Sequence, residues 1–143
     1  MAWAPPLGSG RALGGRMLPA LVCCLLLGCT SDPKVYRVSG KITFAGQPVP
    51  AGTIYFTPDN SKNNSGPAGY AQIKNGQYDT SAQGGQGAKA GPLIVKIEGS
   101  DGANQLFRTQ EVPFELPQKD TSKDFEVPAS EGLKLPKNAG PPP

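Results

Sequence analysis

The sequence predicts an all-β domain of about seven short strands, arranged as a β-sandwich. Two observations carry this prediction. The 143 residues include 19 Gly and 16 Pro, far above average usage, which favours many turns and disfavours helices. Apolar and polar residues also alternate with a period of two in several short segments, and turn signals separate these segments at fairly regular spacing. Short alternating strands with frequent turns are typical of sandwiches.

The first two strands are expected at Val38–Phe44 and Thr53–Thr57. In the first, Val38, Gly40, Ile42 and Phe44 alternate with polar residues, as in a half-buried strand. The segment Ala45–Pro48 turns the chain, because Gly and Pro both favour bends. In the second strand, Ile54 and Phe56 are expected to face the core, and Pro58 to stop the strand.

A hairpin is expected at Asn75-Gly76, the strongest short turn signal in the chain. The strands that it joins are Gly69–Lys74 and Gln77–Thr80. A two-residue turn places Lys74 opposite Gln77, and Ile73 opposite Tyr78.

The second half of the domain is less regular. Leu93–Glu98 alternates clearly, whereas Leu106–Leu116 contains Pro113 and is expected to form an edge strand or a broken one. Lys123–Val127 is expected to be the last strand. The Gly-rich segment Ser81–Pro92 is expected to be mobile or to wrap round a sheet edge.

The alternation assigns a core of large apolar side chains. Burying each of them stabilises the fold by about 1.5–3 kcal/mol, so the set can outweigh ordering entropy without a disulfide. The predicted members are Val38, Ile42, Phe44, Ile54, Phe56, Ile73, Tyr78, Leu93, Val95, Ile97, Phe125 and Val127.

An export signal is expected before the domain. Arg11 and Arg16 precede the apolar run Met17–Leu27, and no acidic residue occurs there. A charged leader and an apolar run of about 7–15 residues are typical of a signal peptide. A helix that spans a membrane needs about 20 apolar residues, so this run is too short to remain as an ordinary anchor.

The end of the run, Leu26-Leu27-Gly28-Cys29, resembles the lipobox of bacterial lipoproteins, although Leu27 stands where a smaller residue is more usual. The resemblance implies cleavage after Gly28, diacylglycerol on the Cys29 thiol and, in many bacteria, an acyl chain such as palmitate on the new amino group. The alternatives are a plain signal peptide cut near Gly28 and an N-terminus that is not exported. The expected organisation is a signal peptide (1–28), a lipidated tether (29–36), the β-sandwich (37–128) and a Pro-rich disordered tail (129–143).

Charge and residue counts narrow the chemistry. Without Arg11 and Arg16, 12 of the 14 basic residues remain against 11 acids, so no basic patch suggests nucleic acid. The chain has no His, and cleavage after Gly28 leaves Cys29 as its only Cys, which excludes the usual zinc sites. The segment Asp59–Asn63 faintly resembles a calcium loop but lacks the Gly and Glu that such a loop requires. We therefore expect no metal and no cofactor.

The strand motifs resemble carboxypeptidase-regulatory-like domains. The resemblance rests on Val38-Ser39-Gly40-Lys41-Ile42, Gly46-Gln47-Pro48-Val49-Pro50, Thr53-Ile54-Tyr55-Phe56, Gly76-Gln77-Tyr78 and Pro92-Leu93-Ile94-Val95-Lys96-Ile97. It spans roughly residues 37–98 and implies a transthyretin-like (prealbumin-like) sandwich. A lipobox followed by one such domain is similar to small lipoproteins of planctomycete-type bacteria. The one enzyme class of this fold, hydroxyisourate hydrolase, depends on His residues and a C-terminal motif that this chain lacks.

The sequence thus predicts a non-enzymatic lipoprotein of the cell envelope, anchored at the outer membrane or the periplasmic face through acyl chains on Cys29. We expect it to serve as a structural or interaction module for an envelope protein or glycan. Alternatives are a carbohydrate-binding module that uses Tyr55 or Tyr70, which are expected on outward faces, and an accessory partner of a secreted peptidase.

Overall fold

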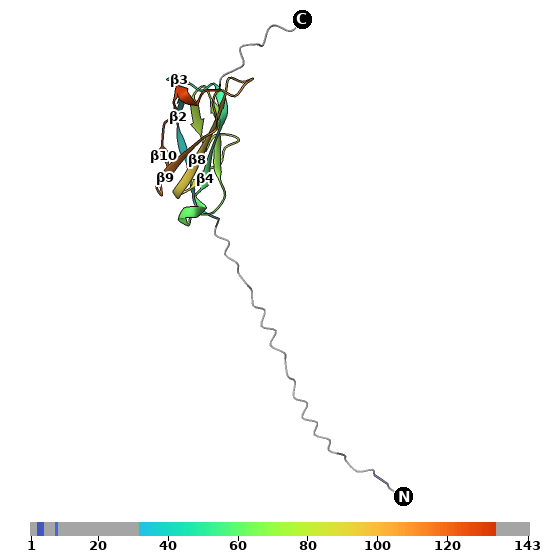
Figure 1. Cartoon of the computed structure of the whole chain (residues 1–143). Helices are drawn as coiled ribbons and strands as arrows, with labels where there is room; N and C mark the ends of the chain where they lie inside the picture. The colour runs from blue at the N-terminus through green and yellow to red at the C-terminus, as the bar shows by residue number, and fades with distance from the viewer. Residues whose placement is uncertain (1–2, 5–7, 9–31, 134–143) are drawn as a thin grey trace. The chain divides into compact units, whose positions relative to one another are not determined.

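The computed structural model describes residues 3–4, 8 and 32–133, and the regular structure of the described domain consists of strands and two short 3-10 helices (Figure 1). Seven strands coincide with the predicted segments, and four further strands have two residues each. The longer strands are β2 (Val38–Phe44), β4 (Ala51–Pro58), β5 (Gly69–Lys74), β6 (Gln77–Asp79), β8 (Gly91–Ser100), β9 (Gln110–Leu116) and β11 (Phe125–Val127). The short ones are β1 (Val35–Tyr36), β3 (Gln47–Pro48), β7 (Ala88–Lys89) and β10 (Thr121–Ser122).

The strands form a curled, mainly antiparallel sheet in the order β10-β2-β6-β5-β4-β8-β9, and β3 and β11 also pair with β2. Only one residue pair, Lys74 with Gln77, joins β5 to β6, whereas β4 pairs along most of its length with both β5 and β8. The sheet therefore divides at the β5–β6 hairpin into two halves that enclose one core. The all-β, sandwich-like character predicted from the sequence is confirmed.

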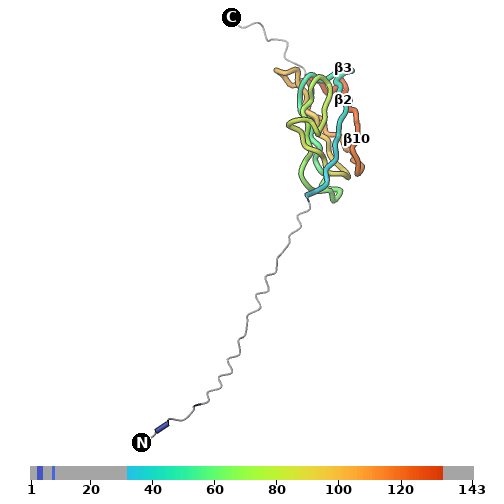
Figure 2. Tube along the Cα trace, turned by 180° about the vertical axis from the view of Figure 1, so that it is seen from behind, coloured from blue at the N-terminus to red at the C-terminus, as the bar shows by residue number. Residues whose placement is uncertain are grey.

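Strand directions define two opposite ends of the domain, which we call the Val38 end and the Phe44 end after the limits of β2. At the Val38 end, β2, β5 and β8 begin and β4, β6 and β9 finish. The first described residues of the domain and the 3-10 helix η1 (Asn60–Lys62) lie at this end in both views (Figures 1 and 2).

The predicted hairpin turn forms, but only the first of its two predicted residue pairs does. The predicted Ile73–Tyr78 pair is not part of the ladder: Tyr78 pairs with Gly40 of β2, and Ile73 pairs with Gly52 of β4. Asn75 and Gly76 have φ angles of 51° and 74°, the two positive values that a type I′ turn requires. Lys74 lies opposite Gln77, as predicted. The turn is fixed from outside as well, since the amides of Asn75 and Gly76 donate to the carbonyls of Pro50 and Val49.

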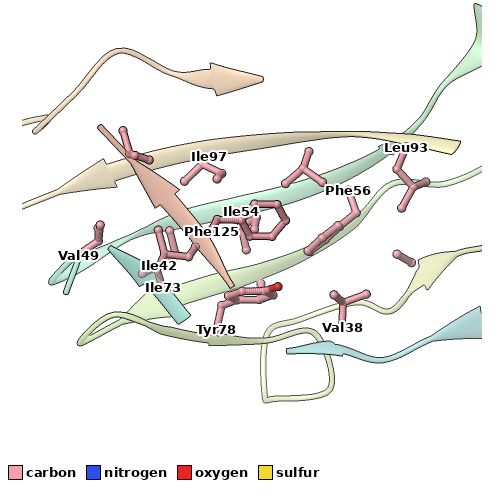
Figure 3. Close-up of a cluster of buried hydrophobic side chains, with 14 of the residues drawn as sticks. Val38, Ile42, Val49, Ile54, Phe56, Ile73, Tyr78, Leu93, Ile97 and Phe125 are labelled. Atoms are coloured by element: carbon pink, nitrogen blue, oxygen red, sulfur yellow. The ribbon is translucent and has the colours of Figure 1, made fainter. Parts of the chain in front are cut away.

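The core contains nearly all of the predicted side chains (Figure 3). Phe44 is the exception, because it is only partly buried and packs against the core, with its ring centroid 5.1 Å from that of Phe107. The buried hydrophobic residues that the alternation did not assign to the core are Val49, Ala71, Ala88, Phe107 and Leu116.

β9 is an edge strand, as Pro113 predicted. It pairs with β8 alone and carries Pro113 opposite Ile94. A proline at a sheet edge is tolerated because the missing amide need not pair there.

The closing strands run parallel to β2 and are interrupted between β10 and β11. At the interruption the Lys123 carbonyl lies directly against Gly40 and accepts a hydrogen bond of 2.6 Å from the Tyr78 hydroxyl. A Cβ added at Gly40 would overlap this carbonyl. The Lys41 amide donates instead to the Asp124 carboxylate at 2.8 Å. Gly40 is therefore the residue that lets the last strand close the core.

Of the two alternatives predicted for Ser81–Pro92, the structure shows the second: β7 pairs with β1, and Gln86 and Tyr70 exchange backbone hydrogen bonds, so the segment wraps round a sheet edge.

The tail prediction is wrong for its first five residues. Residues 129–133 include the 3-10 helix η2 (Ala129–Glu131), and the Leu133 amide donates to the Leu106 carbonyl at 3.0 Å. The Arg108 amide likewise donates to the Glu131 carbonyl. Residues 134–143 of the predicted tail lie outside the described residues.

Candidate functional site

The two tyrosines singled out from the sequence are cross-strand neighbours. Tyr55 on β4 lies directly opposite Tyr70 on β5, on the outer face of the sheet. Tyr70 is 37% exposed and Tyr55 is half-buried. Opposite residues of an antiparallel pair have Cβ atoms about 4.5–5.5 Å apart, so the two side chains form one aromatic patch.

Polar groups continue this row across the sheet. Lys96 on β8 lies opposite Tyr55, and Glu111 on β9 lies opposite Lys96. The Lys96 ammonium and the Glu111 carboxylate are 3.9 Å apart, with both side chains largely exposed, so this ion pair contributes little to stability. Its place beside the tyrosines gives the patch a polar margin.

An open groove of about 580 Å³ adjoins the patch where the sheet divides between β5 and β6. Tyr70, Gln72 and Lys74 all point outward from β5, and the last two line the groove. The patch and the groove thus meet along one strand. The remaining lining comes from β2 and β6, the short segment after β6, and the closing strands: Arg37, Ser39, Gly40, Lys41, Gln77, Tyr78, Asp79, Ala82, Ser122 and Asp124.

An ion pair organises one end of the groove. The Arg37 guanidinium donates to both oxygens of the Asp79 carboxylate, and the Nε–Oδ1 distance is 2.9 Å. These bonds hold the pKa of Asp79 well below its usual range, and donation from Ser81 lowers it further. The pKa of Arg37 is raised by the same contact. Asp79 therefore stays ionised and is unsuited to act as a general acid near neutral pH.

Two lysines flank the other end. Lys41 on β2 lies opposite Gln77, and Gln77 lies opposite Lys74, so the three residues form a row across three strands. The two ion pairs found among the described residues involve neither lysine. The row presents two ammonium groups and a carboxamide, which suit hydrogen bonds to a polar or anionic ligand.

Tyr78 closes the floor of the groove and belongs to the core. It is 3% exposed, and its hydroxyl is engaged by the Lys123 carbonyl. Burial raises its pKa, and the nearby Asp124 carboxylate adds to the effect. The phenol is thus a structural group rather than a free acid or base.

A second hollow, of about 400 Å³, lies at the Phe44 end around Gly52 and Gly99, and its lining is mainly polar. Within the described residues, no group of three or more His, Cys, Asp or Glu side chains is placed to hold a metal ion.

Cys29 and Gly28, the residues expected to be lipidated and cleaved, lie outside the described residues. In the described part of the chain, no helix is long and apolar enough to cross a membrane. The Arg37–Asp79 pair was not anticipated, and of the Lys41–Gln77–Lys74 row only the Lys74–Gln77 pair was predicted. The outward alternation of β2 and β5 marked both lysines as exposed, but their proximity depends on strand pairing.

Comparisons of this chain with protein families, with curated proteins and with solved structures found no match.

Proposed function

We propose that this protein is an exported lipoprotein, held in the cell envelope by acyl chains on Cys29, whose β-domain is a non-enzymatic interaction module. The observation that carries the proposal is the lipobox-like end of the apolar run, Leu26-Leu27-Gly28-Cys29. The first strand of the domain begins at Val35, six residues after Cys29. Two or three acyl chains, at about 0.8 kcal/mol per buried methylene, suffice for durable anchoring.

A carboxypeptidase-regulatory-like, transthyretin-like domain is the finer part of this proposal. What supports it is that the motif segments around Val38, Ile54 and Ile97 lie on three strands of a sandwich-like fold, with the Gly76-Gln77-Tyr78 motif at its hairpin. The motifs bear on the fold and carry no chemistry of their own.

The patch and groove support an interaction role. They bring two tyrosines, two lysines and two glutamine amides to one continuous outer surface, which suits recognition of a polar polymer better than bond cleavage. Asp79 is held ionised by Arg37, and Tyr78 is buried, so neither groove residue is poised for proton transfer at neutral pH.

The tyrosine pair specifically favours a carbohydrate as the partner, because sugar rings stack on exposed aromatic side chains. Binding to an array of envelope glycans tests this. Tyr55→Ala and Tyr70→Ala should each abolish the signal, whereas Thr53→Ala, an outward residue on the same strand as Tyr55, should leave it intact. Equal binding by all variants would remove the tyrosines from the site, and a blank array would remove the glycan.

The anchoring itself is tested by detergent phase partition of cells that express Cys29→Ser. The Cys24→Ser variant is the matched control, because its cysteine lies inside the apolar run and is not preceded by a small residue. We expect Cys29→Ser to leave the detergent phase and Cys24→Ser to remain in it. Identical partition of the two variants would contradict the proposed anchor.

A further inference from the structure

The chain enters the domain through a strand that is fixed to one end of the sandwich. Val35 of β1 pairs with Lys89 and Tyr36 pairs with Ala88, so β1 and β7 form a two-stranded antiparallel sheet. The fit is close: a Cβ added at Gly87 would lie 3.0 Å from the Tyr36 carbonyl oxygen and 3.1 Å from Val35.

β7 is itself seated against the core. Ala88 is fully buried, and a Cβ added at Gly69 would approach Ala88 to 2.8 Å. The entering strand therefore has a rigid support. The predicted tether of residues 29–36 is shorter than expected, because its last two residues, Val35 and Tyr36, form β1.

The remaining tether is short compared with the domain. Six residue steps separate Cys29 from Val35, which is about 20 Å when fully extended and about 13 Å for a flexible chain. β8 alone has ten residues and is about 33 Å long. The tether can therefore bring the Val38 end close to the anchor, while the Phe44 end stays beyond its reach unless the domain lies flat.

Two lysine side chains lie at the Val38 end of the domain. Lys62 ends η1, and Lys119 lies in the turn that leads from β9 to β10. Neither takes part in the two ion pairs found among the described residues.

Two carboxylates at the Val38 end are occupied by the domain itself. Asp59 accepts hydrogen bonds from Ser61, and Asp120 accepts one from the Arg37 amide. These donors are neutral and leave both carboxylates charged, and Glu115 is also exposed at this end. Lys62 and Lys119 therefore offer two local contacts to lipid phosphates, not a net positive surface.

We propose that the Val38 end, with η1 and the turn around Lys119, is the lipid-facing surface of the anchored protein. This inference rests on the proposed attachment through Cys29. It places the loops of the Phe44 end, around Asn75-Gly76 and Gly102, on the side away from the membrane. The patch and groove then open sideways, with Arg37 nearer the lipid than Lys74.

A tryptophan reporter tests this orientation. Trp3 is the only Trp and precedes Cys29, so the chain from Cys29 to Pro143 contains none, and Cys29 is its single thiol. This chain is coupled through Cys29 to vesicles of phosphatidylcholine with a maleimide lipid and a headgroup-nitroxide lipid. A single Trp is placed at the Val38 end by Asn60→Trp, which keeps Lys62 and Lys119, or at the Phe44 end by Ala103→Trp, both exposed positions.

We expect nitroxide quenching to be several times stronger for Asn60→Trp than for Ala103→Trp. Inserting 15 Gly and Ser residues between Cys29 and Asp32 should largely remove the difference, because the longer tether lets the domain tumble. Gln118→Trp, in the exposed turn between β9 and β10, provides a second reporter at the Val38 end if Asn60→Trp does not fold. Equal quenching at the two ends with the native tether, or stronger quenching of Ala103→Trp, would overturn the proposal.

Chemical coupling does not depend on processing in the cell. A failure of acylation in the bacterium would therefore defeat the proposed function and leave this measurement valid, whereas equal quenching would defeat the orientation alone.

Discussion

Replacing Gly40 with Ala tests the closure of the sandwich. The added Cβ would overlap the Lys123 carbonyl and lie 3.0 Å from an Asp124 carboxylate oxygen, so the closing strand must move away from β2. Overpacking of this kind costs about 1–3 kcal/mol, and loss of the Tyr78–Lys123 hydrogen bond adds about 0.5–1.5 kcal/mol. We therefore expect Gly40→Ala to destabilise the domain by about 2–4 kcal/mol.

Urea unfolding followed by circular dichroism measures this change, with the slope of the transition unchanged. Ser39→Ala is the matched control, because Ser39 points outward from the same strand, and it should change stability by less than about 0.5 kcal/mol. Tyr78→Phe alone should cost about 1 kcal/mol. The double variant should be less destabilised than the sum of the two, because both substitutions act on the same carbonyl. A Gly40→Ala protein as stable as the Ser39→Ala control would refute the proposed packing.

Four further predictions concern pH, the hairpin and the chain end. Because burial raises the pKa of Tyr78 in the folded state, the protein should lose stability as pH rises above about 10, the pKa of an unfolded tyrosine, and Tyr78→Phe should reduce that loss in melting curves measured across alkaline pH. Because Arg37 lowers the pKa of Asp79 in the folded state, the stability that this pair contributes is present above about pH 4 and is lost as pH falls. Asp79→Asn should therefore reduce the fall in melting temperature on acidification, and an unchanged fall would exclude the pair as its source. Asn75→Ala should cost about 1 kcal/mol because Asn75 has a φ of 51°, whereas Asn75→Gly should be nearly neutral in the same urea assay. Ending the chain after Leu133 should leave stability unchanged, whereas ending it after Pro128 should cost about 1–3 kcal/mol, because the backbone hydrogen bonds to Leu106 and Arg108 are lost. Equal stability of the two truncated chains would mean that residues 129–133 contribute nothing to stability.

The sequence predicted the strands and the turn whose structure depends on neighbouring residues. Ile54 and Phe56 alternate with outward residues because β4 is buried on one face, and Asn75-Gly76 accepts the positive φ angles that its turn needs. The proline in β9 marked an edge strand for a physical reason, its missing amide.

The rest depends on contacts between distant residues. Val49 lies in the short connection between β3 and β4, and Phe107 lies in the loop before β9, so strand periodicity does not mark them as core, although both are fully buried. Residues 129–133 have the composition of a tail, yet backbone hydrogen bonds to the segment around Leu106 order them.

The candidate site likewise has one part that the sequence predicted and one part that it did not. Alternation placed Tyr55 and Tyr70 on outward faces, and strand register then made them neighbours. The Arg37–Asp79 pair joins residues 42 positions apart, and no sequence pattern specified that partnership.

The most direct test of the central claim is the intact mass of the protein extracted from bacterial membranes. The account predicts a chain that begins at Cys29 and carries a diacylglyceryl group, with Trp3 and the rest of the leader absent. A full-length chain, or a cleaved chain without lipid, would contradict it.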